Sequence, residues 1–159
     1  MRVAVIGIGQ STRGDDAVGP QAVRMWRRLY PKAAGGAKIR VLNVEQPGLD
    51  LLDALEGIDA AVLVDAIQSE GNPGRVRQLT LEDLDSEQSR KHGMHGWAIP
   101  EILELGFRLE QLRSHLVVRV VGIEAEQADV GAALSDRVRK ALPAACASIQ
   151  TQVQTYLSS

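Results

Sequence analysis

Three short segments of the chain hold the side chains best suited to chemistry. The glycine-rich segment 7–19 contains Asp15 and Asp16, an apolar run stops at Asp65, and His92 and His95 stand three residues apart. Carboxylate oxygens and imidazole nitrogens are ligands for divalent transition metals, and imidazole suits nickel, zinc, copper and iron. A carboxylate from the first segment, one from the second and an imidazole from the third could together hold a divalent metal.

The segment 7–19 has some features of a nucleotide-binding loop. It follows an apolar run and opens with Gly7-x-Gly9, but the third glycine of a dinucleotide-binding fingerprint is replaced by Thr12. A phosphate-binding loop needs backbone N–H groups and no negative charge, which two carboxylates contradict. Glu45, which follows the second predicted strand, keeps a nucleotide-binding oxidoreductase open as an alternative function.

Each of these residues also has an ordinary structural explanation. Asp15 or Asp16 could cap the helix that follows, although a cap needs only one of them. Asp65 could cap the loop after its strand, but a carboxylate that follows five apolar residues is costly if it is buried without partners, which favours a functional role. Two histidines at the spacing of His92 and His95 also occur by chance.

The pattern of apolar residues indicates which elements must position these side chains. Short apolar runs predict strands, and apolar residues at helical spacing predict helices. The predicted strands are residues 1–8, 39–44, 60–66, an edge strand at 76–81, and 116–122; the predicted helices are 18–30, 49–55, 99–109 and 135–156, the last capped by Ser135. Strands that alternate with helices predict a single-domain three-layer α/β/α fold over residues 1–159, with a mostly parallel twisted sheet of about five strands. Ligands of such sheets bind beyond the carboxyl ends of the strands, where the aspartates are expected to meet.

Composition narrows the class of protein. Eighteen basic residues against twenty acidic ones give a net charge of −2, which argues against a nucleic-acid partner. The single cysteine, Cys146, cannot form a disulfide within the chain and lies in an Ala-rich helical stretch, so we expect a buried thiol and a reducing compartment. The apolar run at the N-terminus is too short for a signal peptide or a membrane span. We therefore expect a soluble cytoplasmic protein, which we also expect to be a monomer.

The same motifs, taken in order, resemble those of the hydrogenase maturation endopeptidases. That family opens with a strand and a Gly-x-Gly-Asn loop, continues with an acidic pair and x-x-Gly, places Asp-Ala after its third strand, and has a histidine eight residues before a helical leucine. The matching positions here are Gly7-Ile8-Gly9-Gln10, Asp15-Asp16-Ala17-Val18-Gly19, Asp65-Ala66, and His95 with Leu103. The similarity extends to the last predicted helix and so spans almost the whole chain.

This resemblance implies an activity and a set of site residues. The family removes a C-terminal extension from the large-subunit precursor of nickel–iron hydrogenases. Carried over to this chain, Asp16, Asp65 and His95 are the expected catalytic and metal-contacting residues. The resemblance implies that they meet nickel already seated in the precursor, and that the protein has no permanently bound cofactor of its own. A chaperone of hydrogenase assembly that binds the precursor without cutting it stays open as a second alternative.

The chain departs from the family pattern at three places. Gln10 stands where the family usually has Asn, and Asp16 stands where several relatives have Glu, which shortens the reach to a metal. Many relatives carry Asp-Gly-Gly-Thr after the second strand, whereas this chain has Asn-Val-Glu-Gln-Pro-Gly at residues 43–48. We expect this loop to line the cleft, which leaves the roles of Glu45 and His92, and the identity of the processed subunit, open.

Overall fold

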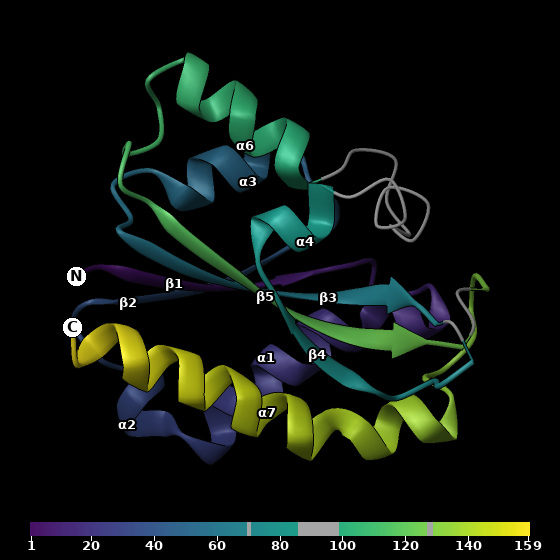
Figure 1. Cartoon of the computed structure of the whole chain (residues 1–159). Helices are drawn as coiled ribbons and strands as arrows, with labels where there is room; N and C mark the ends of the chain where they lie inside the picture. Colours follow the sequence, from purple (N-terminus) through teal and green to yellow (C-terminus); the bar gives the residue numbers. More distant parts are fainter. Residues whose placement is uncertain (70, 86–98, 127–128) are drawn as a thin grey trace.

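A five-stranded sheet organises the molecule. The computed structural model describes residues 1–69, 71–85, 99–126 and 129–159. The strand order is β2-β1-β3-β5-β4, and only β4 runs antiparallel to its neighbour. The strands are β1 (Val3–Ile8), β2 (Ile39–Val44), β3 (Ala60–Gln68), β4 (Val76–Leu79) and β5 (Val117–Ala125). β1 and β3 are inner strands, and β2 and β4 are edge strands (Figure 1). The chain adds β2 on one side of β1 and β3 on the other, so the direction of strand addition reverses at β1.

Helices cover both faces of this sheet (Figure 1). One layer contains α1 (Val18–Leu29), α2 (Pro31–Ala34) and α7 (Asp136–Leu157), and the other contains α3 (Leu49–Leu55), α4 (Leu81–Asp85) and α6 (Ile99–Arg108). Alternate residues of each strand enter two separate apolar cores, as pleating requires. In β3, for example, Val62 and Val64 pack with α1 and α7, whereas Ala61 and Leu63 pack toward α3 and α6. The predicted three-layer α/β/α fold with a mostly parallel sheet is confirmed.

Most predicted elements are present, with corrections at their ends. β3 continues to Gln68 and β5 to Ala125 because these two strands go on pairing with each other beyond the end of β1. The sequence suggested that Asp65 lies at the end of its strand, but the strand continues for three more residues. Residues 31–34 form an additional helical turn that starts at a proline, whose fixed backbone angle suits the first helical position. The long helix α7 runs without a break through Pro143.

Cys146 lies in the core between α7 and α1. Its side chain has no exposed surface, and its Sγ donates to the carbonyl oxygen of Ala22 at 3.4 Å. Burial disfavours the thiolate and raises the pKa of this thiol to about 11. The prediction of an inert core cysteine is confirmed in its burial.

We therefore expect Cys146 to resist alkylation in the folded protein. Iodoacetamide reacts with the thiolate. At about pH 8 the raised pKa keeps the thiol protonated, and the closed core keeps the reagent away from it. Mass spectrometry should find unmodified protein under native conditions and one added carbamidomethyl group after unfolding in urea. Fast labelling of the native protein would contradict the buried placement.

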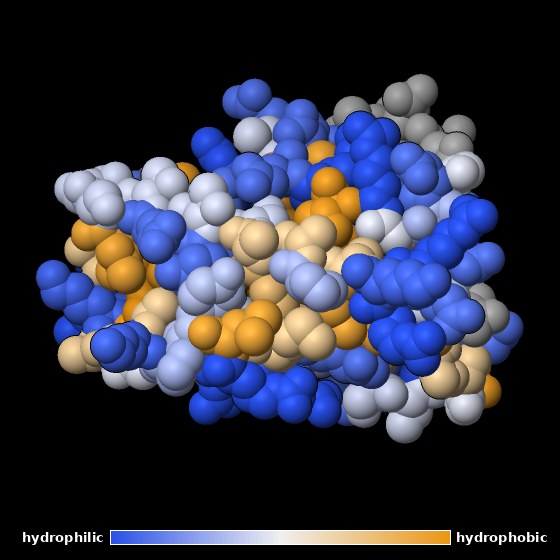
Figure 2. Space-filling view, turned by 90° about the horizontal axis from the view of Figure 1, so that it is seen from below, coloured by the Kyte–Doolittle hydropathy of each residue, from blue (hydrophilic) through white to orange (hydrophobic). Residues whose placement is uncertain are grey.

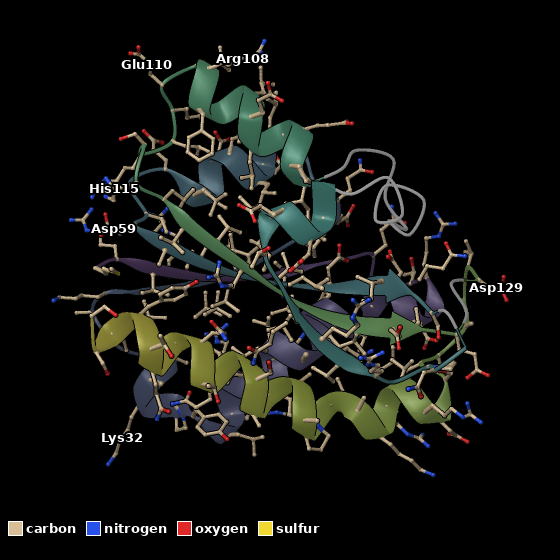
Figure 3. The ribbon with its side chains drawn as sticks, viewed as in Figure 1. Lys32, Asp59, Arg108, Glu110, His115 and Asp129 are labelled. Atoms are coloured by element: carbon tan, nitrogen blue, oxygen red, sulfur yellow. The ribbon has the colours of Figure 1, made fainter. Side chains whose placement is uncertain are left out.

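Asp59 lies where the parallel strands begin, at their amino ends, and its carboxylate holds several groups together there. Its carboxylate accepts the backbone N–H of Arg2 at 2.6 Å, a contact from the Arg113 guanidinium and one from His115 Nε2 at 3.1 Å. Figure 3 shows His115 and Asp59 close together at this edge. The Arg2 N–H first, then His115 and Arg113, hold the pKa of Asp59 well below its usual range. His115 is otherwise a surface residue, with 65% of its side chain exposed.

This lowered pKa predicts the sign of one pH dependence. A carboxyl whose folded-state pKa is depressed stabilises the fold fully above its ordinary value of 3.8, and this contribution is lost as the pH falls below it. Urea titrations from about pH 6 to about pH 3 should show that wild type is more stable than Asp59→Asn at the upper end, with a gap that narrows toward the lower end. A gap that widens on acidification would contradict the assignment.

The outer surface of the α1, α2 and α7 layer mixes apolar and polar residues. Figure 2 shows apolar residues along the middle of this face and hydrophilic residues around them. Exposed apolar side chains of this kind are common on folded proteins. No helix within the described parts of the chain is long and apolar enough to cross a membrane.

Candidate functional site

Two glycines bring the first helix directly onto the ends of the central strands. A Cβ atom at Gly19 would overlap the carbonyl oxygen of Val64 and would lie 2.6 Å from that of Ile8. A Cβ atom at Gly9, whose φ is +146°, would overlap the carbonyl oxygen of Asp16. Glycine is required at both positions because only a residue without a side chain permits so close an approach. The glycine-rich segment therefore positions the 3₁₀ turn η1 (Gly14–Ala17), which carries both aspartates.

Asp16 lies in η1 at the carboxyl end of β1. Only 4% of the residue is exposed, and its Oδ2 accepts the backbone N–H of Gln10 at 2.8 Å. This hydrogen bond closes the loop between β1 and η1 and fixes the orientation of the carboxylate. This carboxylate already binds a backbone N–H of the loop and brings a negative charge there, so the loop does not suit the pyrophosphate of a dinucleotide.

Asp15 has a different environment from its neighbour. It is fully buried, and its carboxylate accepts the Ser135 N–H at 2.7 Å, the Ser135 hydroxyl at 2.9 Å and the Glu126 N–H at 2.8 Å. It therefore ties η1 to the segment after β5 and to the start of α7. Asp15 is therefore a residue that supports the turn through contacts with distant parts of the chain.

The predicted helix caps are confirmed only in the position of Ser135, because no side-chain cap is formed at either helix. Neither aspartate caps α1, because the N-cap residue of that helix is Ala17 and makes no side-chain cap. Ser135 precedes α7, as expected, but its hydroxyl donates to Asp15 and does not cap the helix itself. Both donors of Ser135 are bound by the carboxylate of Asp15, and a charged acceptor forms the stronger kind of hydrogen bond.

Asp65 lies within β3, beside the last residue of β1. It pairs with Ile8 on one side and with Gly122 of β5 on the other, and 6% of it is exposed. Strand alternation puts its side chain on the same face as Ala61 and Leu63, which is the face covered by α3 and α6. Asp65 is thus a buried carboxylate where β1 ends, next to the turn that carries Asp16.

The structure brings Asp16 and Asp65 to one edge of the sheet. Ile8, which pairs with Asp65, immediately precedes Gly9, which packs against the backbone of Asp16, and η1 contacts β3 directly. His92 and His95 lie outside the described residues. Across residues 1–69, 71–85, 99–126 and 129–159, no three His, Cys, Asp or Glu side chains form a group that could hold a metal.

Glu124 is a buried acidic residue that the sequence analysis did not single out. It lies in β5 opposite Ile67, on the same sheet face as Asp65, and only 3% of it is exposed. Its Oε2 has no hydrogen-bond partner among the described residues. The signal was present in the sequence, because Glu124 follows an apolar run just as Asp65 does.

Glu45 lies in a groove beside β2, the edge strand next to β1. We call this the β2 groove: an open cavity of about 670 Å³ between edge strand β2 and helix α3. It is lined by Arg40, Leu42, Asn43, Val44, Glu45, Asp50, Asp53, Ala54 and Glu56. Residues 43–45 thus line this groove, and a place for residues 43–48 in a cleft with Asp16 and Asp65 stays a prediction.

Comparison with known proteins gives consistent matches. The family model described as hydrogenase maturation protease matches residues 23–152, a range that begins after Asp16 and includes Asp65 and His95. The hydrogenase expression/formation protein HupD of Bradyrhizobium diazoefficiens is 27% identical over 118 residues, which cover 74% of this chain and 60% of HupD. The chain thus spans less than two thirds of the length of this relative.

Solved structures match the fold over nearly its whole length. The hydrogenase maturating endopeptidase HybD from E. coli superposes with a TM-score of 0.76 at 18% identity, covering 98% of this chain and 94% of HybD. The [NiFe] hydrogenase maturation protease HybD from Thermococcus kodakarensis gives a TM-score of 0.67 at 24% identity, covering 96% of this chain and 99% of that one. At these identities the likeness establishes the shared fold.

Proposed function

Because this chain belongs to the hydrogenase maturation protease family, we propose that it is an endopeptidase that removes the C-terminal extension of a nickel-loaded hydrogenase large-subunit precursor. The observation that carries this proposal is the pair of buried carboxylates, Asp16 and Asp65, at the carboxyl edge of the sheet. Ligand sites of open α/β sheets lie at this edge.

The proposed site contacts nickel through two oxygens and one nitrogen. Asp16 and Asp65 supply the oxygens and His95 the nitrogen. Ile99, four residues after His95 in the sequence, begins α6 on the side of the carboxyl ends of the strands, which supports the inclusion of His95 (Figure 1). A set of two carboxylates and one imidazole leaves coordination positions open, as contact with a metal held by another protein requires.

In this proposal nickel belongs to the substrate and marks a precursor that is ready to be cut. The Gln10 N–H holds Asp16 in place before the substrate arrives, so little order has to be created on binding. Metal ions in hydrolytic sites polarise a carbonyl group or activate water, which is the chemistry that nickel can supply beside the scissile bond. We propose that the reaction takes place in the cytoplasm, where the lone Cys146 stays reduced, and that one copy of the chain acts alone.

The test compares precursor with and without nickel. Purified protein is mixed with the matched precursor in nickel-loaded, zinc-loaded and metal-free forms, and the products are weighed by mass spectrometry. We expect loss of the C-terminal extension from the nickel-loaded form only. Equal cleavage of all three forms would contradict nickel recognition, and no cleavage of any form would contradict the protease assignment.

His95→Ala separates the protease from a binding chaperone. If the protein is a protease that uses His95, this variant loses processing and still binds the precursor in a pull-down assay. If wild type binds the precursor and never shortens it, the chaperone alternative is correct. A fall in binding and processing by the same factor would instead assign His95 to precursor recognition alone.

A further inference from the structure

The outer edge of β2 offers backbone groups that no described residue pairs with. Among the described residues, β2 pairs only with β1 in the sheet. Val44 accepts the Gly9 N–H at 3.0 Å and Lys38 accepts the Val3 N–H at 2.8 Å, so every second residue between them faces β1. The backbone groups of Val41 and Asn43, which lie between those positions, therefore face away from the sheet. Such an edge is a template for pairing with another extended chain.

The β2 groove beside this edge is acidic. Four of its lining residues, Glu45, Asp50, Asp53 and Glu56, are acidic and exposed. Its one basic residue is already engaged, because Arg40 Nη1 donates to the carbonyl oxygens of Ala54 at 2.9 Å and Glu56 at 3.0 Å. The groove therefore favours a positively charged occupant.

One end of the groove lies next to the segment that carries the proposed site. Its strand side ends at Asn43, Val44 and Glu45, and Val44 is hydrogen-bonded to Gly9, the glycine that packs against Asp16. A chain laid along β2 would thus lead toward the turn that carries Asp16. The six residues of β2 extend over about 20 Å, which is room for about six residues of an extended segment.

We propose that the β2 groove binds an extended, basic segment of a partner chain, which adds to the sheet as a sixth strand beside β2. Main-chain hydrogen bonds to Val41 and Asn43 provide the pairing, and Asp50 and Asp53 of α3 select lysine or arginine side chains. That the bound segment comes from the large-subunit precursor rests on the proposed function, whereas the mode of binding is independent of it. Edge charges that prevent self-pairing of like chains are compatible with an oppositely charged partner.

The binding mode can be tested with three synthetic peptides. Each is a fluorescent, end-blocked peptide of about six residues: alternating Lys and Thr, the same sequence N-methylated at alternate residues, and alternating Glu and Thr. Fluorescence anisotropy with the full-length protein at low salt measures their affinities. We expect the Lys/Thr peptide to bind and the Glu/Thr peptide not to bind. The affinity of the N-methylated peptide should be at least about tenfold lower than that of the Lys/Thr peptide. Equal affinity of the two lysine peptides would overturn strand pairing.

A pair of matched variants tests the location. Asp50→Asn with Asp53→Asn removes two charges from the groove and keeps the Asp53 oxygen that accepts from Gln111. Glu101→Gln with Glu104→Gln makes the same change of net charge at exposed positions of α6, outside the groove. We expect the first variant to weaken the Lys/Thr peptide about tenfold and the second to leave its affinity unchanged. An equal loss in both would overturn the groove assignment, whereas a failure to cleave any precursor bears only on the proposed function.

Discussion

Replacing Asp65 by Asn is expected to reduce processing of nickel-loaded precursor by about 100-fold or more, with the fold intact. Asn has nearly the same volume, so β3 keeps its pairing with Ile8 and Gly122. What it loses is the negative charge that makes a carboxylate oxygen a good metal ligand. The first-order rate of loss of the extension, measured by mass spectrometry at saturating protein, reports this change directly.

Two controls make the result specific. Asp136→Asn removes one charge at an exposed position of α7, where 77% of the side chain is accessible, and should process at the wild-type rate. Urea denaturation of the Asp65 variant should give a free energy of unfolding within about 1 kcal/mol of wild type, because an amide replaces a carboxylate of the same shape. Near-normal processing by a folded Asp65→Asn protein would remove this residue from the proposed site.

Replacing Asp15 by Asn should mainly lower the stability of the fold, whereas the same change at Asp16 should mainly lower processing. An amide keeps one acceptor but turns an N–H toward the donors of Ser135 and Glu126, so at least one strong hydrogen bond is lost. We expect the free energy of unfolding to fall by about 3 kcal/mol, since hydrogen bonds to a charged group contribute about 1.5–3 kcal/mol each. In a chain of this size the melting temperature should drop by about 6–12 °C.

The neighbouring substitution provides the comparison. Asp16→Asn keeps an acceptor for Gln10 and should leave the melting temperature within a few degrees while processing is lost. Ser135→Ala, which deletes only the hydroxyl donor to Asp15, should cost about 1 kcal/mol. If Asp15→Asn melts like wild type, the bonds from η1 to the last helix do not stabilise the protein as described.

The site is predictable from the sequence to the extent that it depends on local pattern. Asp65 stands out because its apolar run stops at a charge, and the turn that bears Asp16 stands out because two glycines end the first apolar run. The same signals placed both residues at the carboxyl edge, which the pairing of Ile8 with Asp65 confirms. Their roles toward nickel stay predictions, as does that of His95, which lies outside the described residues.

What the sequence could not supply depends on contacts between distant residues. The donors that surround Asp15 are 111 and 120 positions away, so local pattern suggested a helix cap at this residue instead. The lengths of β3 and β5 are set by their mutual pairing, which continues after β1 ends. The β2 groove arises from the packing of α3 beside an edge strand, and no motif in either segment marks it.

The bonds from Asp15 to Ser135 also bear on when the protein becomes competent. A ribosome releases the N-terminal turn long before the start of the last helix, and domains complete their folding only when their distant parts are available. The loop that carries Asp16 therefore receives its full support only once the final helix has emerged. A chain that ends before Ser135 would keep the Gln10 bond to Asp16 but would lack the bonds that tie the turn to the last helix.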